Sequence, residues 1–200
     1  GSEMCIRDSF TLTSGRQSPA YVDCRKIISF PKARNALMDM AVACLDQAIG
    51  LDQIDVLAGG ETAGIPFAAF LAERTGKPMV YVRKKPKGFG RGAQIEGLFK
   101  EGARAVLIED LATDGGSKLL FVKALREAGA VCQHTFVVFF YGIIKGALEA
   151  LAKQDLALHH LATWHDVVAQ AEAAGDLEGA RLAAVKRFIA DPDTWTRDMA

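Results

Sequence analysis

The sequence predicts an α/β fold with a central, mostly parallel sheet flanked by helices and followed by a helical C-terminal tail. Short apolar runs alternate with segments whose apolar residues recur at helical spacing, and two of the runs end in glycine or acidic residues. The length of 200 residues suits one domain. We assign residues 9–200 to it and set aside residues 1–8 as a tag scar or non-native leader, because they show no period that continues.

Composition argues against several classes of partner. Hydrophobic residues make up 50% of the chain, and 24 Lys and Arg balance 24 Asp and Glu. This balance predicts no nucleic-acid or membrane partner, and no apolar stretch is long enough to span a bilayer. The four cysteines lack metal-ligand spacing and indicate reduced thiols, hence a cytoplasmic protein. We also expect no metal site built from protein side chains, because His159, His160 and His165 fit no ligand motif and suit packed or helix-surface positions better.

The expected elements follow in order along the chain. They are helices over 31–50, 63–75 and 117–128, buried strands over 54–58, 79–82, 105–108 and 135–140, and a short strand over 21–24. Pro31 suits the first position of a helix, and Gly76 suits a left-handed C-terminal cap. A pair of alanine-rich helices fills 163–189, broken near Gly175 and stopped by Pro192.

A loop of small and hydroxyl-bearing residues couples the apolar run at 105–108 to the next helix. Its residues are Glu109, Asp110, Leu111, Ala112, Thr113, Asp114, Gly115, Gly116 and Ser117. Successive backbone N–H groups in such a loop can converge on an anion at a helix N-terminus, and the lysine of a nucleoside-triphosphatase loop is missing, so a single phosphate fits. Glu109 and Asp110 can accept hydrogen bonds from sugar hydroxyls. The alternative is plain helix capping by Thr113 or Asp114.

A basic, glycine-rich segment follows the apolar run at 79–82. Its cations are Arg83, Lys84, Lys85, Lys87 and Arg91, set among three glycines. This composition disfavours regular structure and suits a mobile loop that closes over a polyanion and excludes water. The alternative is a solvated hairpin that binds nothing.

The loop at 106–117 resembles the phosphoribosyl-diphosphate motif of type I phosphoribosyltransferases: an acidic pair after apolar residues, then a Thr and a glycine-rich turn. Two further segments are similar to the orotate branch of that family. One is the order strand, R-K-x-x-K, glycine-rich loop and E-G over 79–97. The other is the opening F-x-L-x-S-G-R-x-S-P over 10–19, which the purine enzymes lack. The resemblance extends from Phe10 to about Gly142.

The resemblance implies the type I fold with a small hood, and an enzyme that joins orotate to phosphoribosyl diphosphate in pyrimidine biosynthesis. It implies a homodimer whose lid loop reaches the neighbouring subunit, and Mg²⁺ bridging the diphosphate and ribose oxygens. The resemblance also implies roles for single residues. The diphosphate would be bound by Arg83, Lys84 and Lys87 beside the turn Gly60, Glu61 and Thr62, and the base by Thr113 and Tyr21. Catalysis would depend on Lys84, Lys87 and Asp110.

The chain also departs from the family pattern at positions that concern the base and the diphosphate. Thr13 and Ala63 stand where the family usually has Lys, Phe89 stands where many members have His, and Tyr141 follows the last strand where an Arg is common. The base therefore stays open between orotate, with Arg16, Arg25 or Lys26 as carboxylate partner, and another base. A third alternative is a non-catalytic sensor of phosphoribosyl diphosphate, against which Lys84 and Lys87 argue.

Overall fold

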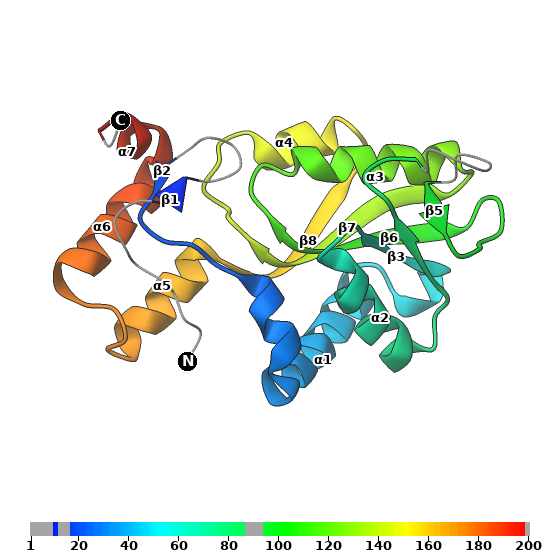
Figure 1. The fold of residues 1–200 in the computed structure, drawn as a ribbon, viewed down its shortest axis with the longest axis horizontal. Helices are drawn as coiled ribbons and strands as arrows, with labels where there is room; N and C mark the ends of the chain where they lie inside the picture. Colours follow the sequence, from blue (N-terminus) through cyan, green and yellow to red (C-terminus); the bar gives the residue numbers. More distant parts are fainter. Residues whose placement is uncertain (1–9, 12–16, 87–93, 199–200) are drawn as a thin grey trace.

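Six strands form the central sheet of the computed structural model, which describes residues 10–11, 17–86 and 94–198 (Figure 1). The strands are β3 (Val56–Gly60), β4 (Met79–Val82), β5 (Ile95–Glu96), β6 (Arg104–Ala112), β7 (Val131–Phe140) and β8 (Ala157–Thr163). They lie in the order β5-β4-β3-β6-β7-β8, and every neighbouring pair is parallel except β4 and β5. The predicted mostly parallel sheet is confirmed.

Helices cover both faces of this sheet, as Figure 1 shows. The helices α1 (Pro31–Ala48) and α2 (Gly64–Thr75) lie on one face, and α3 (Gly116–Glu127) and α4 (Ala147–Ala152) lie on the other. Each layer has its own apolar cluster: Phe67 and Phe136 belong to the first, and Leu107 and Phe121 to the second. The central strands are buried on both faces, which explains why they read as continuous apolar runs.

The local signals set most of the boundaries. Pro31 begins α1, and Gly76 ends α2 in the left-handed conformation with φ of 65°. The strand expected over 21–24 is wrong. Tyr21 makes only an isolated bridge, and the 3₁₀ helix η1 (Cys24–Ser29) begins there instead, because the Asp23 side chain accepts the backbone N–H of Arg25 at 3.2 Å.

The C-terminal tail is longer and more regular than the sequence predicts. α5 (Trp164–Ala173) and α6 (Gly179–Ala190) are the expected pair, but Pro192 begins a third helix, α7 (Pro192–Asp198), rather than ending the helical tail. Before them, α4 and β8 were not predicted. His159 therefore lies on a strand, where its Nε2 is 3.1 Å from Nδ1 of His134 on β7.

The tail and the N-terminal segment form a small unit at one end of the sheet. β1 (Phe10–Thr11) pairs antiparallel with β2 (Gln17–Ser18), and α7 packs on β2. Trp164 is fully buried, and its ring meets Phe139 and Phe188 edge-on. Figure 1 shows the blue strands β1 and β2 beside the red helix α7. That this unit is the expected hood stays a prediction.

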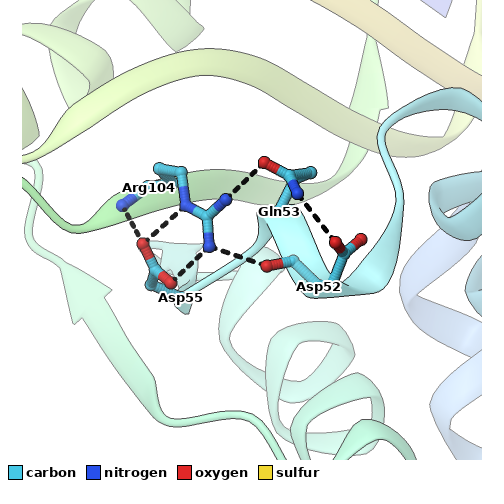
Figure 2. A network of polar contacts seen from close by, with 4 residues as sticks. All are labelled: Asp52, Gln53, Asp55 and Arg104. Atoms are coloured by element: carbon cyan, nitrogen blue, oxygen red, sulfur yellow. Dashed lines mark hydrogen bonds and ion pairs between the residues drawn. The ribbon is translucent and has the colours of Figure 1, made fainter.

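At the opposite end of β6, Arg104 ties the strand to the loop before β3 (Figure 2). Its Nε and Nη2 atoms each donate to one carboxylate oxygen of Asp55 at 2.8 Å, and Nη2 also donates to the Asp52 carbonyl oxygen at 2.7 Å. Gln53 Oε1 accepts from Nη1 at 2.5 Å. These hydrogen bonds hold the pKa of Asp55 well below its usual range. The network fixes the register at the amino end of the sheet.

None of the helices in the described part of the chain is long and apolar enough to cross a membrane.

Candidate active site at the carboxyl edge of the sheet

Most of the predicted site residues in the described part of the chain lie where the order of the strands reverses. The chain passes from β3 to β4 on one side, and β6 lies on the other side of β3. In open α/β sheets such a switch point leaves a crevice beyond the carboxyl ends of the strands. The turn Gly60–Thr62 follows β3, Arg83 and Lys84 follow β4, and the acidic pair lies near the end of β6. The fold thus brings together three segments that are far apart in the sequence.

The acidic pair lies inside β6 rather than after it. β6 continues to Ala112, and Leu111 is in register with Phe139 of β7. Tyr141 then follows β7, and its backbone N–H donates to the Ala112 carbonyl oxygen at 2.9 Å. Ladder hydrogen bonds therefore hold the backbone of Glu109 and Asp110, which makes these carboxylates better fixed than loop residues would be.

Glu109 forms a buried ion pair with a residue that the sequence analysis did not single out. Its Oε2 is 3.0 Å from Nζ of Lys118 in the first turns of α3, and only 7% of Glu109 and 4% of Lys118 is exposed. Lys118 Nζ also donates to the Leu111 carbonyl oxygen at 2.5 Å. The available signal was a lone lysine just after the glycine-rich turn, but sequence alone does not show whether such a side chain points inward.

Two glycines make room for the Glu109 carboxylate. A Cβ added at Gly60 would lie 2.1 Å from Glu109 Oε1, and one added at Gly64 would lie 2.7 Å from the same atom. Oε1 is buried and has no hydrogen-bond partner among the described residues. Burial raises the pKa of Glu109, while the ammonium of Lys118 acts in the opposite direction.

Asp110 faces a different group of side chains. Burial raises its pKa, and the charges of Lys118 and, more weakly, Arg25 oppose that shift. Arg25 Nη2 donates to the Tyr21 hydroxyl at 2.9 Å, and its Nε donates to Asp23 at 3.1 Å. Burial also raises the pKa of the Tyr141 hydroxyl, with a smaller contribution from Tyr21. Arg25 therefore lies near Asp110 and binds Tyr21, and Tyr21 in turn lies near Tyr141.

Burial makes the neighbouring cysteine unsuited to nucleophilic chemistry. It raises the pKa of the Cys24 thiol to about 12, and the charge of Asp110 adds to the shift. The thiolate is the reactive form, so Cys24 is inert at neutral pH.

The start of α3 has the form of an anion cradle. Gly115 adopts φ of 82°, which favours glycine, and α3 begins at Gly116 without a side-chain cap. Asp114 Oδ1 accepts the Gly116 N–H at 3.0 Å, so the capping alternative holds for one donor only. The backbone N–H of Lys118 donates to the Gly115 carbonyl oxygen at 3.0 Å. The helix dipole favours an anion at this end of α3.

The turn after β3 connects to the beginning of the basic segment. Lys84 donates its backbone N–H to Glu61 Oε2 at 2.7 Å, and Arg83 Nη1 lies 3.8 Å from Glu96 on β5. The predicted residues Lys87, Phe89 and Arg91, like Thr13 and Arg16, lie outside the described residues. The described structure therefore gives two of the predicted cations, Arg83 and Lys84, a definite place at the site.

Comparison with known proteins agrees with this geometry. The family model described as a phosphoribosyl transferase domain matches residues 29–168. Orotate phosphoribosyltransferase of Cereibacter sphaeroides is 54% identical over 189 residues, which is 94% of this chain and 82% of the relative. The chain belongs to the orotate phosphoribosyltransferase family. The enzyme of Dinoroseobacter shibae is likewise 54% identical and covered over 84% of its length.

Solved structures of the family share the fold. The crystal structure of orotate phosphoribosyltransferase from Aeropyrum pernix superposes with a TM-score of 0.72 at 31% identity, covering 86% of this chain and 93% of that one. UMP synthase of Leishmania donovani gives a TM-score of 0.78 at 26% identity, covering 90% of this chain and 38% of that one. The expectation of a type I phosphoribosyltransferase fold is confirmed.

Proposed function

We propose that this chain transfers the phosphoribosyl group of phosphoribosyl diphosphate to orotate, releasing orotidine 5′-monophosphate and diphosphate. The observation that carries the proposal is the acidic pair of β6, which leads directly into the cradle at the start of α3. Membership of a family whose 54% identical relatives are named orotate phosphoribosyltransferases supports the choice of base.

The reaction joins N1 of the base to C1 of the ribose while the bond from C1 to the diphosphate breaks. The cradle at 113–117 binds the 5-phosphate through backbone N–H groups, and the carboxylates of Glu109 and Asp110 orient the ribose hydroxyls. Arg83, Lys84 and Lys87 neutralise the departing diphosphate beside the turn at 60–62. Catalysis on this view is positioning plus stabilisation of developing charge.

Arg25 is the described cation best placed for the orotate carboxylate. It lies beside Asp110, and its hydrogen bond to Tyr21 orients the guanidinium on the side of the site where Tyr141 lies. Arginine pairs with carboxylates through two parallel hydrogen bonds. Arg25 therefore supplies a charge on the side of Tyr141, which stands where an Arg is common in the family.

We expect Arg25→Gln to raise KM for orotate about tenfold, the loss of one charge-assisted contact, with little change in KM for phosphoribosyl diphosphate. Lys26→Gln, the neighbouring cation in η1, is the matched control. Equal changes in both KM values, or a larger effect of Lys26→Gln, would assign the carboxylate to another residue.

The magnesium ion belongs to the substrate in this proposal. In the described part of the chain, no three His, Cys, Asp or Glu side chains come together as metal ligands. Mg²⁺ prefers phosphate oxygens to cages of protein ligands, so when bound it would come with phosphoribosyl diphosphate and would screen the charge of the diphosphate.

A homodimer and a cytoplasmic location complete the proposal. Leu98, directly beyond β5 at the end of the basic segment, is 91% exposed and offers an apolar contact to a second subunit. Cys24, Cys44 and Cys132 are free thiols, which suits a reducing compartment. Sedimentation of the wild type and of Leu98→Asp checks the dimer, because the variant should shift the species toward monomer.

An absorbance assay tests the activity directly. The wild type and the Asp110→Asn variant are each mixed with orotate, Mg²⁺ and phosphoribosyl diphosphate, and the loss of orotate absorbance is followed. We expect turnover by the wild type and a fall of at least about 100-fold in the variant. Diphosphate release with a different base, and none with orotate, would move the chain to another specificity on the same scaffold. Binding of phosphoribosyl diphosphate without release of diphosphate to any base would identify a sensor.

A further inference from the structure

A buried lysine stands behind the acidic pair and touches only the first of its two members. Lys118 Nζ lies 3.0 Å from Glu109 Oε2 and 2.5 Å from the Leu111 carbonyl oxygen. Only 4% of Lys118 is exposed, so its ammonium cannot contact bulk solvent freely. A lysine is almost never buried without a partner, and here both partners belong to β6.

The two oxygens of Glu109 are in different situations. Oε2 accepts the hydrogen bond from Lys118, whereas Oε1 is buried beside Gly60 and Gly64 and accepts none from the described residues. A buried carboxylate oxygen without a donor is unfavourable, and its remaining capacity is for an O–H or N–H donor. Vicinal ribose hydroxyls are donors of that kind.

We propose that Lys118 is a positioning residue for the substrate: it holds Glu109 by Oε2, which leaves Oε1 as the oxygen that accepts a ribose hydroxyl. The inference rests on the proposed function and deepens it, because it assigns a role to a residue outside the phosphoribosyl-diphosphate motif. Lys118 itself does not touch the substrate.

The second contact of Lys118 explains how the carboxylate can serve both partners. The Leu111 carbonyl oxygen belongs to the β6 backbone, so it anchors the ammonium independently of Glu109. A lysine held only by Glu109 would follow the side chain or lose its partner.

The charges around Glu109 also favour a role for Lys118. Burial raises the pKa of Glu109, and the charged groups that face it are Lys118 on α3, Asp110 on β6 and Lys84 after β4. Asp110 raises the pKa of Glu109 further, whereas the two lysines lower it, and Lys118 contributes more than Lys84. Lys118 is thus the main group that opposes the effect of burial on the pKa of Glu109, and an ionised carboxylate is the better acceptor for a hydroxyl.

The test is a kinetic comparison of Lys118→Met with Lys118→Arg and the control Lys123→Met, an exposed lysine on the same helix. We expect Lys118→Met to raise KM for phosphoribosyl diphosphate at least about tenfold and to leave KM for orotate within about twofold. Lys118→Arg should recover part of the loss, and Lys123→Met should match the wild type. Equal changes in both KM values would overturn the proposal.

A double-mutant cycle with Glu109→Gln tests whether Lys118 acts through that carboxylate. In the Glu109→Gln background, Lys118→Met should have almost no further effect on KM for phosphoribosyl diphosphate; additive effects would show that Lys118 acts elsewhere. The acid limb of the pH profile of kcat/KM should move up by about 1–3 pH units in Lys118→Met, because Glu109 loses its cation. An unshifted limb would contradict the proposal.

Two further measurements distinguish a failure of this inference from a failure of the proposed function or of folding. Calorimetric binding of magnesium phosphoribosyl diphosphate reports on Lys118 even if the wild type does not turn over orotate, a result that would refute the proposed function alone. If Lys118→Met does not fold, Lys118→Arg decides, since its donors are displaced while its charge is kept. We then expect affinity for phosphoribosyl diphosphate to fall about threefold, and wild-type affinity would refute the inference.

Discussion

Two ion pairs at opposite ends of β6 use the same chemistry in opposite ways. At the amino end, the pair of Arg104 with Asp55 is half-exposed. The Asp55 carboxylate accepts three hydrogen bonds from Arg104, two from the guanidinium and one from the backbone N–H. At the carboxyl end, the pair of Lys118 with Glu109 is buried and leaves one carboxylate oxygen without a donor. The first pair is complete without a ligand, and the second, at the carboxyl edge where the site lies, is not.

The difference teaches that two properties distinguish an ion pair that only stabilises this fold from one suited to a ligand. These properties are how deeply the pair is buried and whether all its polar atoms have hydrogen-bond partners. Surface pairs gain little because water and salt screen them. A buried pair costs desolvation of both ions, and a protein that only needed a stable core would fill the space with apolar side chains. The incomplete Glu109 pair is what the role proposed for it at the substrate requires.

The sharpest way to break the comparison is to remove one cation from the buried pair. We expect Lys118→Met to lower the free energy of unfolding by about 3–5 kcal/mol, because Glu109 is left buried without a partner. Lys123→Met, at an exposed i,i+4 pair, should change it by less than about 0.5 kcal/mol. Urea denaturation measures both. A small effect of Lys118→Met would mean that the Glu109 side chain relaxes to solvent.

A second substitution fills the space that the Glu109 carboxylate occupies. Gly60→Ala would place a Cβ 2.1 Å from Glu109 Oε1, so the side chain must move, at a cost of about 1–3 kcal/mol in folding free energy. Gly116→Ala is a matched control, since its Cβ would meet nothing closer than 3.5 Å. Thermal denaturation of both variants checks this, and equal stabilities would show that Glu109 does not need the slot.

The pH dependence of stability should differ between the two pairs. The pKa of Glu109 is raised, so the folded state binds its proton more tightly than the unfolded state does. The stability of the wild type relative to Glu109→Gln should therefore fall as pH rises from about 4.5 toward neutrality. Melting temperatures of the two proteins at matched pH values test this sign. A rising difference would mean that Lys118 outweighs burial.

The smallest effect is expected at the exposed pair. Arg104→Gln should lower the melting temperature at neutral pH by about 2 °C or less, because solvent screens the interaction. The pKa of Asp55 is lowered, so its contribution is present above the usual Asp value of 3.8 and is lost as the pH falls below it. A large fall in melting temperature at neutral pH would show that Arg104 contributes as much to the stability of the fold as Lys118 does.

The central sheet and the position of the acidic pair could be predicted because each depends on a local pattern. Apolar runs at 54–58 and 105–108 marked buried strands, and an acidic pair that closes such a run lies at the ligand edge of a parallel sheet. The strand β8 was missed because Ala157–Thr163 is half-exposed and carries two histidines, so its composition resembles neither a buried strand nor an amphipathic one.

The partners of the site residues could not be predicted for a different reason. Lys118 and Arg25 reach their partners through side-chain directions that only the packed fold determines. The slot for Glu109 needs glycines from β3 and α2, segments that pair with β6 only in space. Sequence periodicity describes one element at a time, whereas these contacts join three.

The packing of α7 on β2 has a consequence for how the protein is made. The family-model match ends at residue 168, yet α7, at residues 192–198, packs on β2 at residues 17–18. A nascent chain emerges from the ribosome N-terminus first. The β2 strand must therefore wait, without its packing partner, through the translation of nearly the whole domain. A stalled or prematurely ended chain would carry the central sheet beside an unsupported β1–β2 hairpin.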